Sequence, residues 1–152
     1  MSRAVRAALR LVFACAIFGC EAPDPGLVPD ERLRAELGLT ELDRVHTVGI
    51  STGVRERAEP DSVTVLAGDF VQFVSGDWLV HEVAFDLDSV RGELRHFLEV
   101  TGQTASPPLI HRDSRFVLSF VDAPPGRYPY SLAGNRGSGR GVIVVVPPAS
   151  AR

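Results

Sequence analysis

The stretch SVTVLAGDFVQFVS, residues 62–75, alternates apolar and polar side chains on both sides of a short turn. Val63 and Val65 precede the turn, and Val71 and Phe73 follow it. A period of two places such side chains on one face of a β-strand, so the stretch predicts a β-hairpin or a strand–turn–strand corner. Similar short segments recur at residues 45–51, 80–85, 115–120, 127–132 and 141–146. About seven strands separated by turns predict an all-β sandwich.

Three other segments depart from this pattern. Between residues 88 and 100 the apolar side chains recur at helical spacing, which predicts one amphipathic helix inserted among the strands and ended by Gly102. Residues 29–38 favour a short helix capped by Asp30, with an irregular tether as the alternative. Residues 51–62 are polar and are expected to form a loop or a wide hairpin. The apolar face of the inserted helix consists of Val90, Leu94, Phe97 and Leu98.

The N-terminus has the organisation of an export signal. Three arginines precede a short apolar run, which is too short to span a bilayer and ends in IFGC at Cys20. This ending resembles a bacterial lipobox, so we predict a lipoprotein signal peptide at residues 1–19 and lipidation of Cys20. Ordinary signal cleavage and an uncleaved anchor are the alternatives. Residues 20–44 are then a linker with the short helix, and Glu21 favours sorting to the outer membrane over the inner one.

Removal of residues 1–19 changes both the charge and the chemistry of the chain. It takes away three of the sixteen basic residues and no acidic one, so the formal charge falls from −3 to −6. Such a charge disfavours nucleic acid and anionic lipid as partners, because both need clustered positive charge. Cys15 and the single methionine leave with the signal, and lipidation consumes Cys20. The mature domain is therefore expected to have no free thiol, no disulfide and no thioether.

Two stretches in the predicted β region together resemble the cupredoxin family of blue-copper domains, such as plastocyanin and pseudoazurin. The first is VTVLAGDFVQFVSGDWLVHEVAF and the second is PPGRYPYSLAGNRGSGRGVIVVV. The resemblance covers residues 45–146 and implies an all-β, cupredoxin-like Greek-key β-sandwich of about seven strands with one inserted helix, followed by a frayed tail at 147–152. The matching positions are Val63, Val65, Ala67, Gly68, Asp69, Phe73, Asp77, His81, Val83, Phe85, Pro125, Gly126, Tyr128, Tyr130 and Gly139, with Ser75 in place of an asparagine.

The copper ligands that the resemblance implies are mostly replaced. Blue-copper sites use two histidines, a thiolate and a long axial thioether. The first histidine corresponds to His81, but the cysteine position corresponds to Leu132, the second histidine to Asn135 and the methionine to Arg140. Leucine offers no lone pair, and arginine does not lose its proton. We therefore expect a degenerate copper site, with the arginine charge close to the former metal position and Leu132 extending the core.

The histidines leave two interpretations open. His81 is expected to be a partly buried, hydrogen-bonded histidine, because one imidazole alone does not hold a metal. The alternative is a copper site without thiolate, in which His46, His96 or His111 joins His81.

Two surface features also allow more than one interpretation. Arg127, Arg136 and Arg140 are expected to be solvated, with an anion-binding patch beside the glycine loop as the alternative. Trp78 is either an exposed docking residue or a cover over the core.

No catalytic pattern accompanies the predicted fold, since Ser119 and Ser131 lack a histidine–carboxylate signature around them. We therefore expect a protein without enzymatic activity and without a cofactor, which serves as a binding or interaction module. We expect the protein to lie on the periplasmic side of the bacterial envelope and to be anchored to the outer membrane by its lipid. Its expected partner is another envelope protein or a small ligand. A blue-copper electron-transfer protein, with copper as cofactor, is the alternative that the family resemblance implies.

Overall fold

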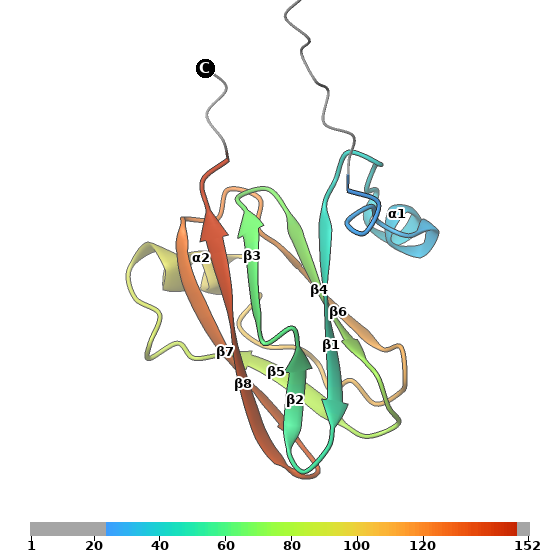
Figure 1. Cartoon of the computed structure of the whole chain (residues 1–152). Helices are drawn as coiled ribbons and strands as arrows, with labels where there is room; N and C mark the ends of the chain where they lie inside the picture. The colour runs from blue at the N-terminus through green and yellow to red at the C-terminus, as the bar shows by residue number, and fades with distance from the viewer. Residues whose placement is uncertain (1–23, 149–152) are drawn as a thin grey trace, which may run out of the picture.

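Eight β-strands form two four-stranded sheets in the computed structural model, which describes residues 24–148 (Figure 1). The predicted signal peptide, the lipidation site at Cys20 and the end of the tail lie outside these residues. The architecture confirms an all-β sandwich with one inserted helix, and the strand number is eight. The strands are β1 (Val45–Thr52), β2 (Glu56–Glu59), β3 (Ser62–Leu66), β4 (Phe70–Ser75), β5 (His81–Phe85), β6 (Arg115–Ser119), β7 (Gly126–Gly134) and β8 (Gly137–Val146).

The two sheets exchange strands in a Greek-key manner. One has the order β2-β1-β4-β6 and the other β3-β8-β7-β5. The pairs β1–β4 and β3–β8 are parallel, and the remaining pairs are antiparallel. Because β3 and β4 belong to different sheets, residues 62–75 form the predicted strand–turn–strand corner and no hairpin. The chain also changes sheet between β2 and β3, where the Glu59–Pro60 peptide bond is cis.

The additional strand, β2, lies in the segment that was expected to be a loop or a wide hairpin. The wide hairpin is the correct alternative, since Thr52 pairs with Glu56 and Gly49 pairs with Glu59. The hydrophobic pattern does not reveal this strand, because its two inward positions are occupied by Glu56 and Ala58. A buried glutamate stands where a strand of this kind normally has an apolar residue.

The core between the sheets is rich in aromatic rings. Phe73 from β4 meets Tyr130 from β7 edge to face, with ring centroids 4.9 Å apart. Tyr128 is fully buried, and its hydroxyl donates a hydrogen bond to the Pro124 carbonyl oxygen at 2.7 Å. Burial of a large apolar side chain contributes about 1.5–3 kcal/mol, so this cluster is a main source of the stability of the sandwich.

The inserted helix is shorter than the sequence predicts. Helix α2 (Glu93–Val100) begins five residues after the expected start, because Asp86 and Ser89 close a turn before it. The predicted apolar face is nevertheless correct, since Val90, Phe97 and Leu98 are buried and Leu94 packs against the core.

The segment before the first strand also packs on the sandwich. Helix α1 (Glu31–Leu37) has Asp30 as its N-cap, as the sequence predicts, and Gly38 takes the left-handed conformation after its end. Leu33 is 1% exposed, whereas Leu37 is 48% exposed. Asp30 also pairs with Arg115 on β6 at 2.6 Å. Neither helix within residues 24–148 is long and apolar enough to cross a bilayer.

Candidate functional site

Four segments meet at the end of the sandwich that is opposite to α1 and to the end of β8 (Figure 1). We call this the loop end, made of residues 52–55, 76–80, 109–114 and 134–137. The Thr52 amide donates a hydrogen bond to Asp77 Oδ2 at 2.9 Å. The Asp113 amide donates to the Ser75 carbonyl oxygen at 2.8 Å, and the His81 amide donates to the Leu109 carbonyl oxygen at 3.0 Å. His81 also pairs across the β5–β7 ladder with Gly134. These contacts place His81 directly beneath the loops.

Both nitrogens of the His81 ring are engaged by carboxylates. Nδ1 lies 2.7 Å from Glu56 Oε2, and Nε2 lies 2.8 Å from Asp77 Oδ1. The imidazole is 0% exposed. An ionised carboxylate can only accept a hydrogen bond, so either both ring nitrogens carry hydrogen or one carboxyl group keeps its proton and donates. In each case neither nitrogen has a free lone pair.

Glu56 enters this site from β2 and is 1% exposed. Its second oxygen, Oε1, accepts a hydrogen bond from the Thr52 hydroxyl at 2.9 Å. The chain makes room for it with two glycines of the β7–β8 hairpin. A Cβ atom at Gly134 would overlap the Glu56 carboxylate, and one at Gly139 would overlap the Glu56 carbonyl oxygen. The glycines of this hairpin therefore accommodate a buried acid.

Asp77 closes the site from the β4–β5 loop. Its oxygens accept hydrogen bonds from the amides of Thr52 and Leu79, at 2.9 and 2.8 Å, in addition to the contact with His81. Burial raises the pKa of this carboxyl, but the hydrogen bonds from Thr52, Leu79 and His81 together hold the pKa below its ordinary value. Asp77 is therefore ionised at neutral pH.

The residues at the other expected ligand positions do not gather around His81. Leu132 is fully buried and pairs with Val83 and Gly139. Asn135 is exposed in the two-residue turn between Gly134 and Gly137. Strand alternation turns Gly139 inward and Arg140 outward. The Arg140 side chain is exposed, so its charge lies outside the sandwich and differs from the expectation of a cation beside the former metal position.

The other histidines do not converge on His81. His46 contacts Asp69 at 2.8 Å near the start of β1, His96 is exposed on α2, and His111 is exposed with its ring 6.3 Å from that of Trp78. Within residues 24–148, no group of three or more histidine, cysteine or acidic side chains is arranged to hold a metal ion. Around His81 the two carboxylates lie at different ring nitrogens, so the three side chains point at one another.

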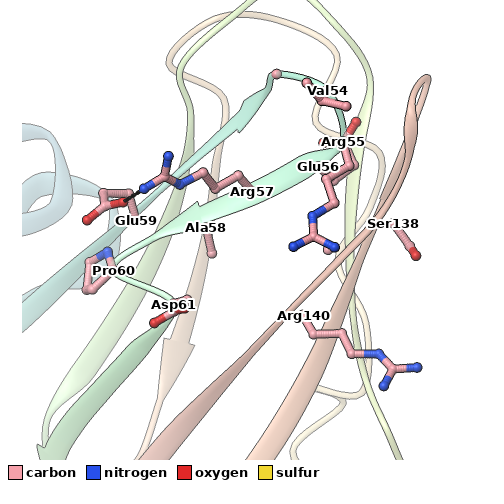
Figure 2. Close-up of a pocket in the computed structure, with 12 residues that line it drawn as sticks. Val54, Arg55, Glu56, Arg57, Ala58, Glu59, Pro60, Asp61, Ser138 and Arg140 are labelled. Atoms are coloured by element: carbon pink, nitrogen blue, oxygen red, sulfur yellow. Dashed lines mark hydrogen bonds and ion pairs between the residues drawn. The ribbon is translucent and has the colours of Figure 1, made fainter.

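A groove of about 1010 Å³ opens between β2 and the first half of β8 (Figure 2). Its rim carries Arg55, whose side chain extends between the two strands, and Arg57, which pairs with Glu59 at 2.8 Å. A second depression, of about 560 Å³, is bordered by Arg127 and Arg140. Of the three arginines considered for an anion-binding patch, these two share one depression, and Arg136 stands apart in the β7–β8 turn.

Comparisons with known proteins return amicyanin and cupredoxin structures at low similarity. No protein-family model matches the chain, and no curated protein does. Among solved structures, an oxidized amicyanin variant is 23% identical, with 67% of this chain and 82% of that chain covered and a TM-score of 0.45. A reduced amicyanin variant is 22% identical, covers 72% of this chain and 88% of its own, and has a TM-score of 0.47. A purple cupredoxin from Nitrosopumilus maritimus is 18% identical, with coverages of 66% and 99% and a TM-score of 0.44.

Proposed function

We propose that this chain is a cupredoxin-like interaction module of the bacterial envelope that works without copper and without enzymatic activity. The observation that carries the proposal is the hydrogen bonding of His81 to Glu56 and Asp77 at both ring nitrogens. Copper coordination by this histidine needs a neutral imidazole with an exposed lone pair. To bind a metal, His81 would have to give up a hydrogen bond to Glu56 or to Asp77, and the loss is costly at Glu56 because that carboxyl group is buried.

The donor set around His81 does not fit a blue-copper ion. Leucine at position 132 supplies no electron pair, Asn135 is exposed in the turn, and Arg140 is a cation on the outer face. Blue-copper redox chemistry depends on a thiolate ligand. After loss of the predicted signal peptide, the only cysteine of the chain is the predicted lipidation site, Cys20. The proposed function therefore includes no electron transfer through copper.

Hydrogen bonding of His81 to Glu56 and Asp77 takes the place that metal coordination has in a blue-copper domain. In either arrangement of the protons, Glu56 and Asp77 satisfy both nitrogens of the buried imidazole inside the sandwich. The site then holds the loops together without any cofactor, since Glu56 and Asp77 both bond to Thr52 as well.

The membrane tether is the second part of the proposal. Lipidation of Cys20 would anchor the chain to the outer membrane through residues that precede α1. Because α1 lies at the end opposite to the β7–β8 hairpin, the loop end would face away from the membrane and toward other envelope proteins (Figure 1). The acidic charge of the mature chain argues against nucleic acid as a partner.

A copper titration of the mature protein tests the proposal. We expect no intense visible absorption of the copper–thiolate kind and no tight binding in calorimetry. The matched variants are His81→Ala and His96→Ala, which remove the buried histidine or an exposed one. Tight binding that is lost in His81→Ala and retained in His96→Ala contradicts the proposal. Weak heats lost with His96→Ala alone support it, because they report an exposed histidine. Mass spectrometry of the N-terminal peptide tests the lipid, and an unmodified Cys20 would remove the tether.

A further inference from the structure

The loop end concentrates exposed apolar side chains. Within residues 24–148, eight large hydrophobic side chains are exposed, and four of them lie there, namely Val54, Trp78, Val80 and Ile110. Trp78 is 71% exposed, although tryptophan is normally well buried. Apolar side chains gathered in this way mark an interaction site more often than scattered ones do.

These side chains lie on neighbouring loops. The bridge between His81 and Leu109 brings Val80 and Ile110 next to each other. The His111 ring meets the Trp78 ring at an interplanar angle of 68°. The hydrogen bond from the Thr52 amide to Asp77 connects the turn that carries Val54 to the loop that carries Trp78. Beneath these side chains, the hydrogen bonds of His81 to Glu56 and Asp77 connect β5 to β2 and to the β4–β5 loop.

The charge around this surface is opposite to that of the whole domain. The same four segments carry three exposed arginines, Arg55, Arg112 and Arg136, against one exposed aspartate, Asp113. The chain as a whole has an excess of acidic residues. Val54 and Arg55 also border the groove between β2 and β8, so the loop end adjoins that groove (Figure 2). An apolar centre with a rim of arginines complements an apolar segment flanked by carboxylates.

We propose that the loop end docks an acidic segment of a protein partner, with an apolar side chain of that segment on Trp78 and its carboxylates on Arg55, Arg112 and Arg136. This inference rests on the proposed function as an interaction module. The described N-terminal residues and the end of β8 lie at the other end of the sandwich, which favours a separate protein as the occupant (Figure 1).

The test uses a synthetic peptide in which glutamates alternate with leucines, and a second peptide with lysines in place of the glutamates. Trp78 is the only tryptophan of the chain, so its fluorescence reports binding at this surface. We expect the glutamate peptide to change this fluorescence, with binding weakened by added salt, and the lysine peptide to have no effect. Equal responses to both peptides, or no response to the glutamate peptide, overturn the proposal.

Variants locate the contact by calorimetry. Trp78→Ala is expected to weaken glutamate-peptide binding about tenfold or more, and Leu42→Ala, an exposed apolar residue near α1, is the matched control. Replacement of Arg55, Arg112 and Arg136 by glutamine should abolish the salt dependence, whereas replacement of Arg91 and Arg127 should leave it. Equal effects of the paired variants overturn the proposal.

Two other occupants of this surface are tested separately. Self-association through Trp78 in sedimentation overturns the proposal, and so does Trp78-dependent binding to phospholipid vesicles. The copper titration is independent of all these outcomes, so a failure of this docking surface is distinguishable from a failure of the proposed function.

Discussion

Gly134 lies directly across the β5–β7 ladder from His81, and its missing side chain leaves the space that the Glu56 carboxylate occupies. The glycine, the histidine and the glutamate come from three different strands, β7, β5 and β2. Gly134 and Gly139 of the hairpin therefore leave space for a buried acidic residue.

Gly134→Ala is expected to destabilise the fold by about 1–3 kcal/mol, because the added methyl group overlaps the Glu56 carboxylate. In a Glu56→Ala background the same change should cost less, since the carboxylate is gone. Denaturant unfolding of the four proteins of this cycle measures the coupling. Gly53→Ala is the control, because a Cβ there meets nothing within 4 Å, and it should stay within about 0.5 kcal/mol. An identical cost of Gly134→Ala in both backgrounds would show that Glu56 does not fill this space.

Glu56→Ala by itself should cost about 3–5 kcal/mol, since it leaves the buried His81 ring without one of its two partners. Arg57→Ala on the same strand is the comparison, because Arg57 and Glu59 form an exposed pair that contributes little. Thermal or denaturant unfolding measures both. If the two variants are equally stable, the bond between Glu56 and His81 does not support the fold.

The stability of the chain should fall in acid partly through Asp77. Its pKa is lowered in the folded protein, so its contribution is present above the ordinary aspartate pKa and is lost as the pH falls through the lower, folded value. Asp77→Asn should therefore flatten the acid limb of the stability profile. Asp88→Asn, at an exposed aspartate, should leave that limb unchanged. The account would be contradicted if both variants gave the same profile.

The two tyrosines, which are the only ones in the chain, should resist alkaline titration. Burial raises the pKa of Tyr128 to about 12, and burial together with the nearby Asp61 charge raises that of Tyr130 further. The pKa values of both tyrosines are higher in the folded chain than in the unfolded chain. The tyrosines therefore contribute to the stability of the fold fully below their unfolded pKa, and this contribution is lost as the pH rises through the folded pKa values. Ultraviolet difference spectra should show both tyrosines titrating late in the native chain and near their ordinary pKa in denaturant. Early titration of the native protein would place a tyrosine outside the core.

Leu33→Ala and Leu37→Ala compare two leucines of the same short helix. Leu33 is buried against the sandwich, so Leu33→Ala should lower the free energy of unfolding by about 2–5 kcal/mol. Leu37 is half exposed, so Leu37→Ala should change the free energy of unfolding little. Unfolding in denaturant measures both. Equal, small effects would mean that α1 does not contribute to the stability of the sandwich in solution.

The sequence predicts most of the scaffold because apolar alternation determines which face of a strand is buried. Val63 and Val65 follow that rule, as do Val71 and Phe73, and the apolar face of α2 follows the helical spacing of its side chains. The start of α2 is displaced because Asp86 and Ser89 hold a turn, which is a local hydrogen-bond preference that hydrophobic periodicity does not record.

The site is harder to predict because its main acid comes from a strand that the hydrophobic pattern hides. His81 is identified by the cupredoxin-like motif, and Asp77 belongs to that same motif. Glu56 lies 25 residues before His81 and is surrounded by other charged residues, so its burial has no local signal. The glycines at positions 134 and 139 are the available indication that a bulky group fills the adjacent space.

The central claim is that both nitrogens of His81 are held by carboxylates, and nuclear magnetic resonance of the imidazole side chains tests it most directly. In the mature, isotope-labelled protein at neutral pH, the account predicts that both His81 ring nitrogens are hydrogen-bonded and that the hydrogens in these bonds exchange slowly with solvent. Their signals should persist when copper(II) is added in equal amount, while those of exposed His96 and His111 serve as the reference. A His81 nitrogen that lacks a hydrogen bond, or His81 signals that disappear first on addition of copper, would contradict the account.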